Sequence, residues 1–85
     1  MIQREITVAN CNGFHLRPAA LFTQTASDFQ STVRILYNGQ KAEGRNLLEI
    51  LKLGIEEGSR VTLVIDGSDE KEAMEELLGI FYKSI

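Results

Sequence analysis

The chain has 85 residues, of which 44% are hydrophobic and 25% are charged, a composition that fits one small globular domain without a second core. A single cysteine excludes an internal disulfide, and no apolar run reaches the roughly 18 residues that a membrane-spanning helix needs. Nine Lys and Arg against twelve Asp and Glu give a net charge of −3, which disfavours nucleic acid as a partner. We therefore expect a cytoplasmic protein that does not insert into the membrane.

The chain begins with a pattern typical of a β-strand. Residues 2–8 alternate between apolar and polar side chains, and Arg4 is the one exception on the apolar side. A period of two predicts a strand with one face toward a core and one toward water. A loop rich in turn-forming residues follows at 10–13.

The period changes after this loop. From Ala19 to Phe29 apolar residues recur every three or four positions, which predicts an amphipathic helix over residues 16–27. Pro18 falls in the first turn of this helix, where the N–H that proline lacks would have no intrahelical partner.

The middle of the chain predicts a hairpin and a short helix. An Asn-Gly pair separates residues 33–37 from 40–43, and this pair suits the positive φ angles of a tight turn between antiparallel strands. Asn46 is a good N-cap for the next helix, and Glu49 has the spacing of a capping box. Gly54 is the natural residue to end that helix.

The last third predicts one more strand and one more helix. Apolar residues alternate with others over 61–65, as in the first strand. Asp69 and Glu72 repeat the spacing of a capping box. The buried stripe of the final helix is predicted to consist of Ala73, Leu77, Ile80 and Phe81.

The predicted order of elements is therefore β-α-β-β-α-β-α. Strands with one apolar face and helices with one apolar stripe favour a two-layer α+β sandwich, in a single domain over residues 1–85. Ferredoxin-like domains, including RNA-binding ones, share the first six elements, so the function has to be inferred from a site.

Chemistry is concentrated where the first loop meets the first helix. The only histidine, His15, lies at this junction, and Arg17 follows two residues later. The free N–H groups and partial positive charge of a helix N-terminus attract an anion, and a guanidinium can add a fork of donors. The same potential favours a neutral imidazole, whose lone pair can attack a phosphoryl group. We interpret His15 as a reversible phosphoryl acceptor; the alternative is a plain polar cap beside a solvated arginine.

The string Gly-x-His-x-Arg-Pro-Ala-Ala over residues 13–20 favours the phosphoryl acceptor. Together with two Asn-Gly pairs, the helix at 47–54 and the segment 67–70, it resembles the HPr family over essentially the whole chain. These proteins are the histidine-containing phosphocarriers of the bacterial phosphoenolpyruvate:sugar phosphotransferase system. The resemblance implies an open-faced β-sandwich, in which three helices cover one side of a four-stranded antiparallel sheet.

The resemblance also implies roles for individual residues. Enzyme I would phosphorylate His15 on Nδ1, and the phosphoryl group would pass to the A component of a sugar-specific enzyme II. Arg17 would contact the phosphoryl group, and Asn12 would help to orient the ring. The protein would then be a covalent carrier and not an enzyme. A regulatory member of the nitrogen-related branch is the alternative, and an RNA-binding module is disfavoured by the negative charge.

Two predicted helices carry more apolar residues than contact with a core requires. We expect the surplus to form a docking surface for protein partners beside the histidine, the alternative being that these residues fill the core. The residues concerned are Ala20, Leu21, Leu47, Leu48 and Leu51.

Three positions bear on regulation and on ligands. Asn46 stands where many Gram-positive members carry a regulatory serine, so it can cap the helix but cannot be phosphorylated. Glu49 is expected to place a negative charge on the docking surface, which disfavours acidic partners. Cys11 with His15 does not make a metal site. We expect no metal, no cofactor and a monomeric chain.

Overall fold

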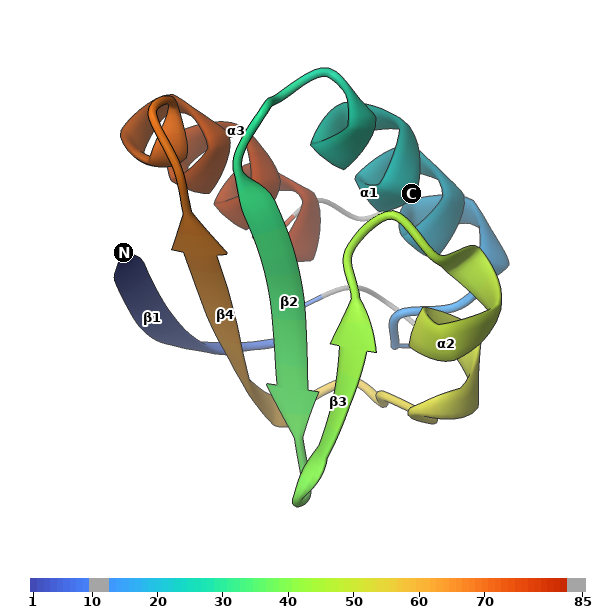
Figure 1. Ribbon diagram of the computed structural model, residues 1–85. Helices are drawn as coiled ribbons and strands as arrows, with labels where there is room; N and C mark the ends of the chain where they lie inside the picture. Colours follow the sequence, from blue (N-terminus) through green and yellow to red (C-terminus); the bar gives the residue numbers. More distant parts are fainter. Residues whose placement is uncertain (10–12, 83–85) are drawn as a thin grey trace.

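The computed structural model describes residues 1–9 and 13–82, and its elements follow the predicted order. The strands are β1 (Ile2–Thr7), β2 (Thr32–Tyr37), β3 (Gln40–Glu43) and β4 (Arg60–Asp66). The helices are α1 (Leu16–Ser27), α2 (Leu47–Lys52) and α3 (Glu70–Tyr82) (Figure 1). The predicted helix over 16–27 is confirmed at both ends, whereas Val8, predicted in the first strand, lies just beyond it and is buried.

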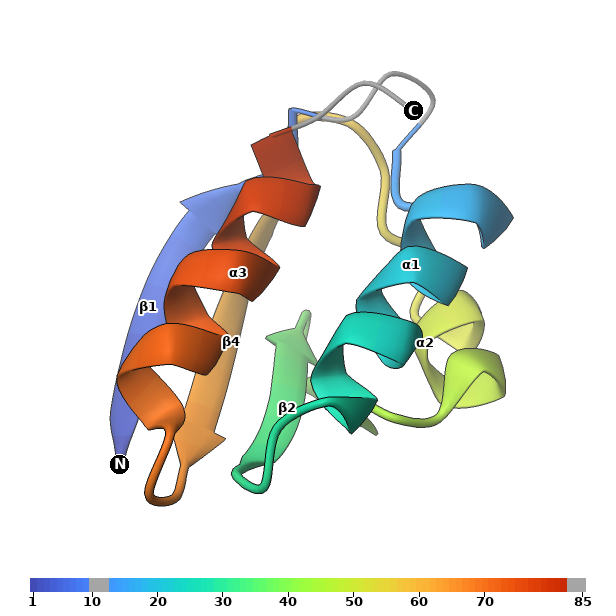
Figure 2. The ribbon, with the colours of Figure 1, turned by 90° about the horizontal axis from the view of Figure 1, so that it is seen from above.

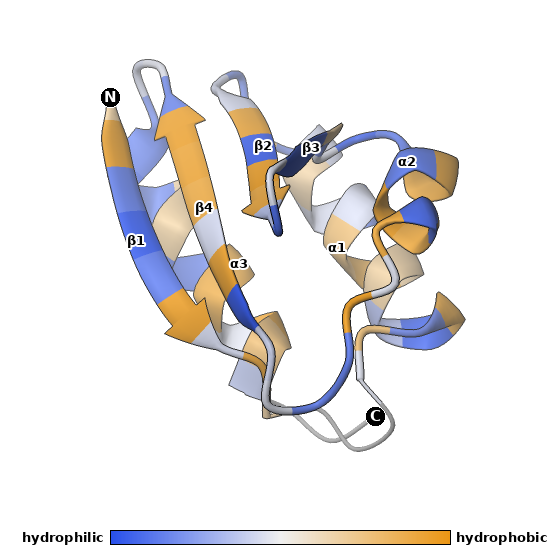
Figure 3. Cartoon of the chain, turned by 90° about the horizontal axis from the view of Figure 1, so that it is seen from below, coloured by the Kyte–Doolittle hydropathy of each residue, from blue (hydrophilic) through white to orange (hydrophobic). Residues whose placement is uncertain are grey.

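The four strands form one antiparallel sheet in the order β1-β4-β2-β3. The last strand of the chain therefore lies between the first two (Figure 1). β4 is paired on both sides, and Figure 3 shows it apolar over most of its length, while β1 at the edge is polar between Ile2 and Ile6. This arrangement confirms the predicted four-stranded α+β fold.

All three helices lie on one face of the sheet, and the other face is open. In Figure 2, α3 lies over β1 and β4, with which it makes contact, and α1 packs beside it. The predicted buried stripe of α3 is confirmed and also includes Met74. The stripe of α1 is buried at Ala19, Phe22 and Ala26, whereas Phe29 lies past the helix end and is half-buried.

Three phenylalanines form the centre of the core between α1 and α3. The Phe14 ring stacks on the Phe81 ring with centroids 4.6 Å apart, and Phe22 meets both edge-on at 5.7 and 5.5 Å. All three are at most 3% exposed. Burying a side chain of this size contributes about 1.5–3 kcal/mol, so the loop that carries Phe14 is firmly attached to the core.

The turns confirm two predictions from glycine chemistry. Asn38 and Gly39 both have positive φ angles, 52° and 79°, as the tight turn of a β2–β3 hairpin requires. Gly54, at φ 66°, follows the C-cap Leu53 at the end of α2.

The predicted capping box at α2 is half confirmed. The Asn46 side chain accepts a hydrogen bond from the Glu49 backbone N–H at 3.2 Å. The Glu49 carboxylate does not return to the Asn46 backbone amide; it accepts from the Glu43 N–H at 3.0 Å and from the Asn46 side-chain amide at 3.1 Å. The Asn46 amide donates to the Glu43 carbonyl at 3.0 Å, so it needs no carboxylate.

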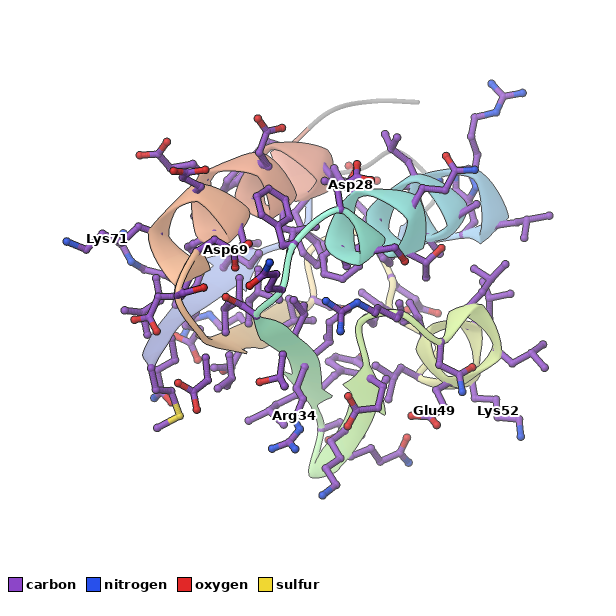
Figure 4. The ribbon with its side chains drawn as sticks, turned by 45° about the horizontal axis from the view of Figure 1, so that its top comes forward. Asp28, Arg34, Glu49, Lys52, Asp69 and Lys71 are labelled. Atoms are coloured by element: carbon purple, nitrogen blue, oxygen red, sulfur yellow. The ribbon has the colours of Figure 1, made fainter. Side chains whose placement is uncertain are left out.

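The predicted capping box at α3 is wrong. The Asp69 carboxylate accepts hydrogen bonds from the backbone N–H groups of Gln30 and Ser31, at 2.8 and 3.0 Å, and from the Ser31 hydroxyl. These donors lie in the turn between α1 and β2, which the fold brings against the start of α3 (Figure 4). The hydroxyl and the two amides hold the pKa of Asp69 below its ordinary value of 3.8.

Candidate functional site

The loop that leads into α1 is held against the segment after α2. The Phe14 N–H donates to the Ile55 carbonyl at 3.0 Å. Gly13 has a φ of 78°, and a Cβ atom there would lie 2.6 Å from the Ile55 carbonyl oxygen and 2.7 Å from Glu56 Cα. Only glycine fits this close approach without a backbone shift. The backbone before His15 is therefore fixed at both Gly13 and Phe14.

His15 is the N-cap residue of α1. Its backbone is extended, with φ −81° and ψ −167°, and its side chain makes no capping hydrogen bond. The side chain is half-buried, and the His15 carbonyl accepts the Ala19 N–H at 3.0 Å. The imidazole therefore stands at the helix N-terminus without a hydrogen bond to the helix.

The first turn of α1 has free donors. Within residues 1–9 and 13–82, the backbone N–H groups of Leu16 and Arg17 have no acceptor, and Pro18 has no N–H. The first turn carries no acidic residue, so no carboxylate of its own competes for the positive end of the helix dipole. This helix start can hold an anion beside His15.

Arg17 is available to bind such an anion. Its side chain is exposed and makes no ion pair with any residue that the structure describes. By contrast, Arg34 pairs with Glu43 at 3.3 Å and Arg60 pairs with Glu5 at 3.9 Å, both on the open face of the sheet. An uncommitted guanidinium two residues from His15 supplies the fork of donors that a phosphoryl group accepts.

The predicted docking residues divide between surface and core. Leu48 is 69% exposed and Leu21 37%, whereas Leu47 and Leu51 are half-buried and pack against the core. Ala20 is also half-buried. The deep core position of α2 belongs to Ile50, which is 1% exposed. The two helices that carry these residues, α1 and α2, pack against each other.

Leu16 is a surface residue that was not among the predicted docking residues. Its side chain is 60% exposed, directly between His15 and Arg17. The sequence did contain a signal for its exposure, because Leu16 is an apolar residue at the first helical position and precedes the buried stripe of α1. We refer to Leu16, Ala20, Leu21, Leu47, Leu48 and Leu51 as the leucine patch.

The expectation for Glu49 is wrong. Its carboxylate accepts hydrogen bonds from the Glu43 backbone N–H and from the Asn46 side-chain amide. Figure 4 shows Glu49 and Lys52 on the side of α2 that faces away from α1. Glu49 therefore does not place its charge on the leucine patch.

Some expectations concern residues or groups that the structure does not test. Asn12 and Cys11 lie outside the described residues. Among the described residues no three His, Cys, Asp or Glu side chains come together as a metal site. None of the described helices is long and apolar enough to span a bilayer.

The comparisons with known proteins identify the family. A family model described as "PTS HPr component phosphorylation site" matches residues 2–83. This chain belongs to the HPr family. The phosphocarrier protein HPr of Buchnera aphidicola is 40% identical over 77 residues, covering 91% of each chain. The HPr-like protein Crh of Halalkalibacterium halodurans is 37% identical over 83 residues, covering 98% of this chain and 99% of Crh.

A solved structure confirms the fold. HPr from Thermoanaerobacter tengcongensis superimposes with a TM-score of 0.90 at 35% identity, over the full length of both chains. The chain is therefore a phosphocarrier of the phosphotransferase system, a protein that carries a phosphoryl group on a histidine and is not itself an enzyme. Membership of the HPr family implies enzyme I and the A components of enzyme II as partners.

Proposed function

We propose that His15 is the phosphorylated residue, and that it accepts the group on Nδ1 from phospho-enzyme I and passes it to an enzyme II A component. The observation that carries the proposal is that the chain contains one histidine, which stands without a capping bond at the start of α1. A carrier that uses a histidine has no other acceptor in this sequence.

The chemistry follows from the surroundings of the ring. The Nδ1 lone pair forms a bond to phosphorus while the bond between phosphorus and the donor breaks. The transferred group carries negative charge into the region of the free N–H groups of Leu16 and Arg17. A helix N-terminus stabilises such charge by about 0.3–1 kcal/mol, or about 2 kcal/mol when partly buried. This gain is small enough for the group to be released to the next protein.

Arg17 and Asn12 complete the proposed site. Arg17 has no competing ion pair among the described residues, which supports a direct contact between its guanidinium and the phosphoryl oxygens. Asn12, outside the described residues, is proposed to orient the imidazole.

The leucine patch is the proposed contact surface for both partners. Exposed apolar side chains flanked by a reactive group suit a brief protein–protein contact, in which the partner supplies any metal and the alignment of the reacting atoms. We expect the carrier to act as a monomer, because one chain closes its own core. We expect it to act in the cytoplasm, where phosphoenolpyruvate is available.

Phosphorylation in vitro tests the proposal. The chain is incubated with radiolabelled phosphoenolpyruvate, Mg²⁺ and enzyme I, and the bound label is challenged with acid and with base. We expect one acid-labile, base-stable phosphoryl group per chain, and none in His15→Ala. Thr62→Ala, on the open face of the sheet, is the control and retains full labelling. Acid-stable label, or label that survives His15→Ala, would contradict the proposal.

A regulatory role also has a specific basis, because Crh of Bacillus subtilis, described as a catabolite repression HPr, is 33% identical and covers 99% of this chain. Sugar uptake in a deletion strain separates the two roles. If the protein serves transport, the deletion strain should lose sugar uptake. The native gene should restore that uptake, and the His15→Ala gene should not. Intact uptake would favour regulation.

A further inference from the structure

The side chain of Arg45 links the start of α2 to the end of α1. Its Nε donates to the Ala26 carbonyl at 3.3 Å, and its Nη2 donates to the Ser31 carbonyl at 3.0 Å and to the Phe29 carbonyl. One guanidinium thus serves three backbone carbonyls in and just beyond the last turn of α1. A planar fork of fixed donors suits this geometry, whereas an ammonium is a single point charge.

The end of α1 needs a cation that its own sequence does not provide. Its last turn contains no basic residue, and its C-cap is Asp28. The carbonyls of a last helical turn have no intrahelical donors and carry the negative end of the dipole, so an acidic cap is unfavourable there. Arg45 supplies the missing positive charge from another part of the chain.

The same contacts join the residue before α2 to the end of α1. Arg45 immediately precedes Asn46, the N-cap of α2, and β2 and β3 separate the two helices in the sequence. Among the described residues, no other side-chain hydrogen bond joins α1 or its following turn to residues 43–52. The placement of α2 against α1 therefore depends on apolar packing and on Arg45.

One of the three residues that Arg45 binds, Ser31, is also held by the segment that leads into α3. Ser31 is 1% exposed; its N–H and hydroxyl donate to the Asp69 carboxylate while its carbonyl accepts from Arg45. Gly67 packs so closely that a Cβ there would lie 2.5 Å from the Ser31 hydroxyl oxygen. Figure 4 shows Asp69 beside this turn. Ser31 is therefore bonded to Arg45 through its carbonyl and to Asp69 through its N–H and hydroxyl.

We infer that Arg45 is a positioning residue for phosphoryl transfer. By fixing the start of α2 against the end of α1, its guanidinium holds the α2 half of the leucine patch in register with the α1 half, which carries His15. Arg45 need not touch the partner or the phosphoryl group. This inference rests on the proposed function of His15 and of the patch.

The test compares three variants with the native chain as substrates of enzyme I. Arg45→Met removes the fork, Arg45→Lys keeps the charge without the fork, and Arg60→Met removes an exposed arginine from the open face of the sheet as the control. We expect Arg45→Met to raise KM about three- to tenfold, a size typical of altered coupling between sites, with kcat within about twofold of native. Arg45→Lys should fall between native and Arg45→Met, and Arg60→Met should match native.

Amide hydrogen exchange supplies a second readout. We expect faster exchange at residues 47–53 in Arg45→Met than in the native chain, with exchange in β4 unchanged. If Arg45→Met does not fold, KM and amide hydrogen exchange are both measured on Arg45→Lys instead.

Three results would overturn the inference: a native KM in Arg45→Met, full recovery of KM by Arg45→Lys, or unchanged exchange in α2. Full recovery by lysine would indicate a simple charge effect on the partner. A failure of the proposed function is recognised separately, because the native chain would then carry no acid-labile label.

Discussion

Phe14 stacks on Phe81, with ring centroids 4.6 Å apart and planes 16° apart. Phe14 is the residue immediately before His15, and Phe81 belongs to the last turn of α3. His15, the proposed phosphoryl acceptor, lies at the end of a loop. Its neighbour in the chain, Phe14, is nevertheless packed in the centre of the core.

Replacing Phe14 tests this attachment. We expect Phe14→Ala to lower the free energy of unfolding by about 3–5 kcal/mol, because it removes a buried ring and leaves a cavity. Phe14→Leu retains most of the volume and should cost less than about 1.5 kcal/mol. Urea unfolding followed by circular dichroism measures both values, and equal losses in the two variants would argue against cavity formation as the main cause.

Two glycines with nearly the same φ angle separate backbone strain from close packing. Gly13 and Gly39 have φ angles of 78° and 79°, but a Cβ would collide with backbone only at Gly13. We expect Gly39→Ala to lower the free energy of unfolding by about 1–2 kcal/mol through strain alone. Gly13→Ala should lose a further 1–3 kcal/mol, roughly, from overpacking, and its phosphorylation should slow. Similar losses at both positions would show that the loop can shift freely.

The cap of α2 can be tested by exchanging its side chain. Asn46→Ala is expected to lower the free energy of unfolding by about 0.5–2 kcal/mol, because the Glu49 N–H loses its acceptor. Asn46→Ser restores an acceptor and should recover most of the loss. The same urea titration gives both numbers, and a native-like Asn46→Ala would disprove the capping role.

Two exposed leucines on different faces of the molecule allow the docking surface to be tested with a matched control. Leu48 is 69% exposed in the leucine patch, and Leu36 is 38% exposed on the open face of the sheet. We expect Leu48→Ala to change stability by less than about 0.5 kcal/mol and to raise the KM of enzyme I for the chain. Leu36→Ala should leave that KM unchanged; a rise in Leu36→Ala and not in Leu48→Ala would move the docking surface to the sheet.

Acid should weaken the contacts at the start of α3. The pKa of Asp69 is held below 3.8 by the Ser31 hydroxyl and two backbone amides. The pKa of Glu70 is held below 4.5 by the Gly67 amide and the N-terminal ammonium. A lowered folded pKa adds stability that is complete above the ordinary value and is lost as pH falls through the folded value.

We therefore expect Asp69→Asn to be less stable than the native chain at neutral pH, with the difference closing below about pH 4. Urea midpoints from about pH 7 to pH 2 measure the effect. If the difference in stability between Asp69→Asn and the native chain did not change with pH, the lost stability would be due to packing and not to ionisation of Asp69.

Local sequence patterns predicted every element of this fold. Periodicity located the strands and helices, and turn chemistry located the hairpin at Asn38-Gly39, because these signals depend on neighbours within a few residues. The strand order was not predictable, since pairing of β4 with both β1 and β2 joins distant segments. The same limit explains Asp69, whose spacing suggested a cap while its partners lie 38 and 39 residues away.

The candidate site was predicted in part. The string around His15 placed the imidazole at a helix start, because proline and the apolar stripe fix that start locally. The division of the leucines between surface and core depends on how α1 and α2 pack, so Leu48 could not be separated from Leu51 beforehand. Arg45 gave no local signal, since its three acceptors lie 14 to 19 residues earlier.

The position of β4 has a consequence for biosynthesis. Until residues 60–66 leave the ribosome, β1 has no strand to pair with, and only the β2–β3 hairpin can form. A nascent chain that stops before Arg60 should therefore form no stable sheet and remain open to proteases, because a lone hairpin is only marginally stable. The sheet can form only after residues 60–66 are available, so its first three strands are joined in one late step and not segment by segment.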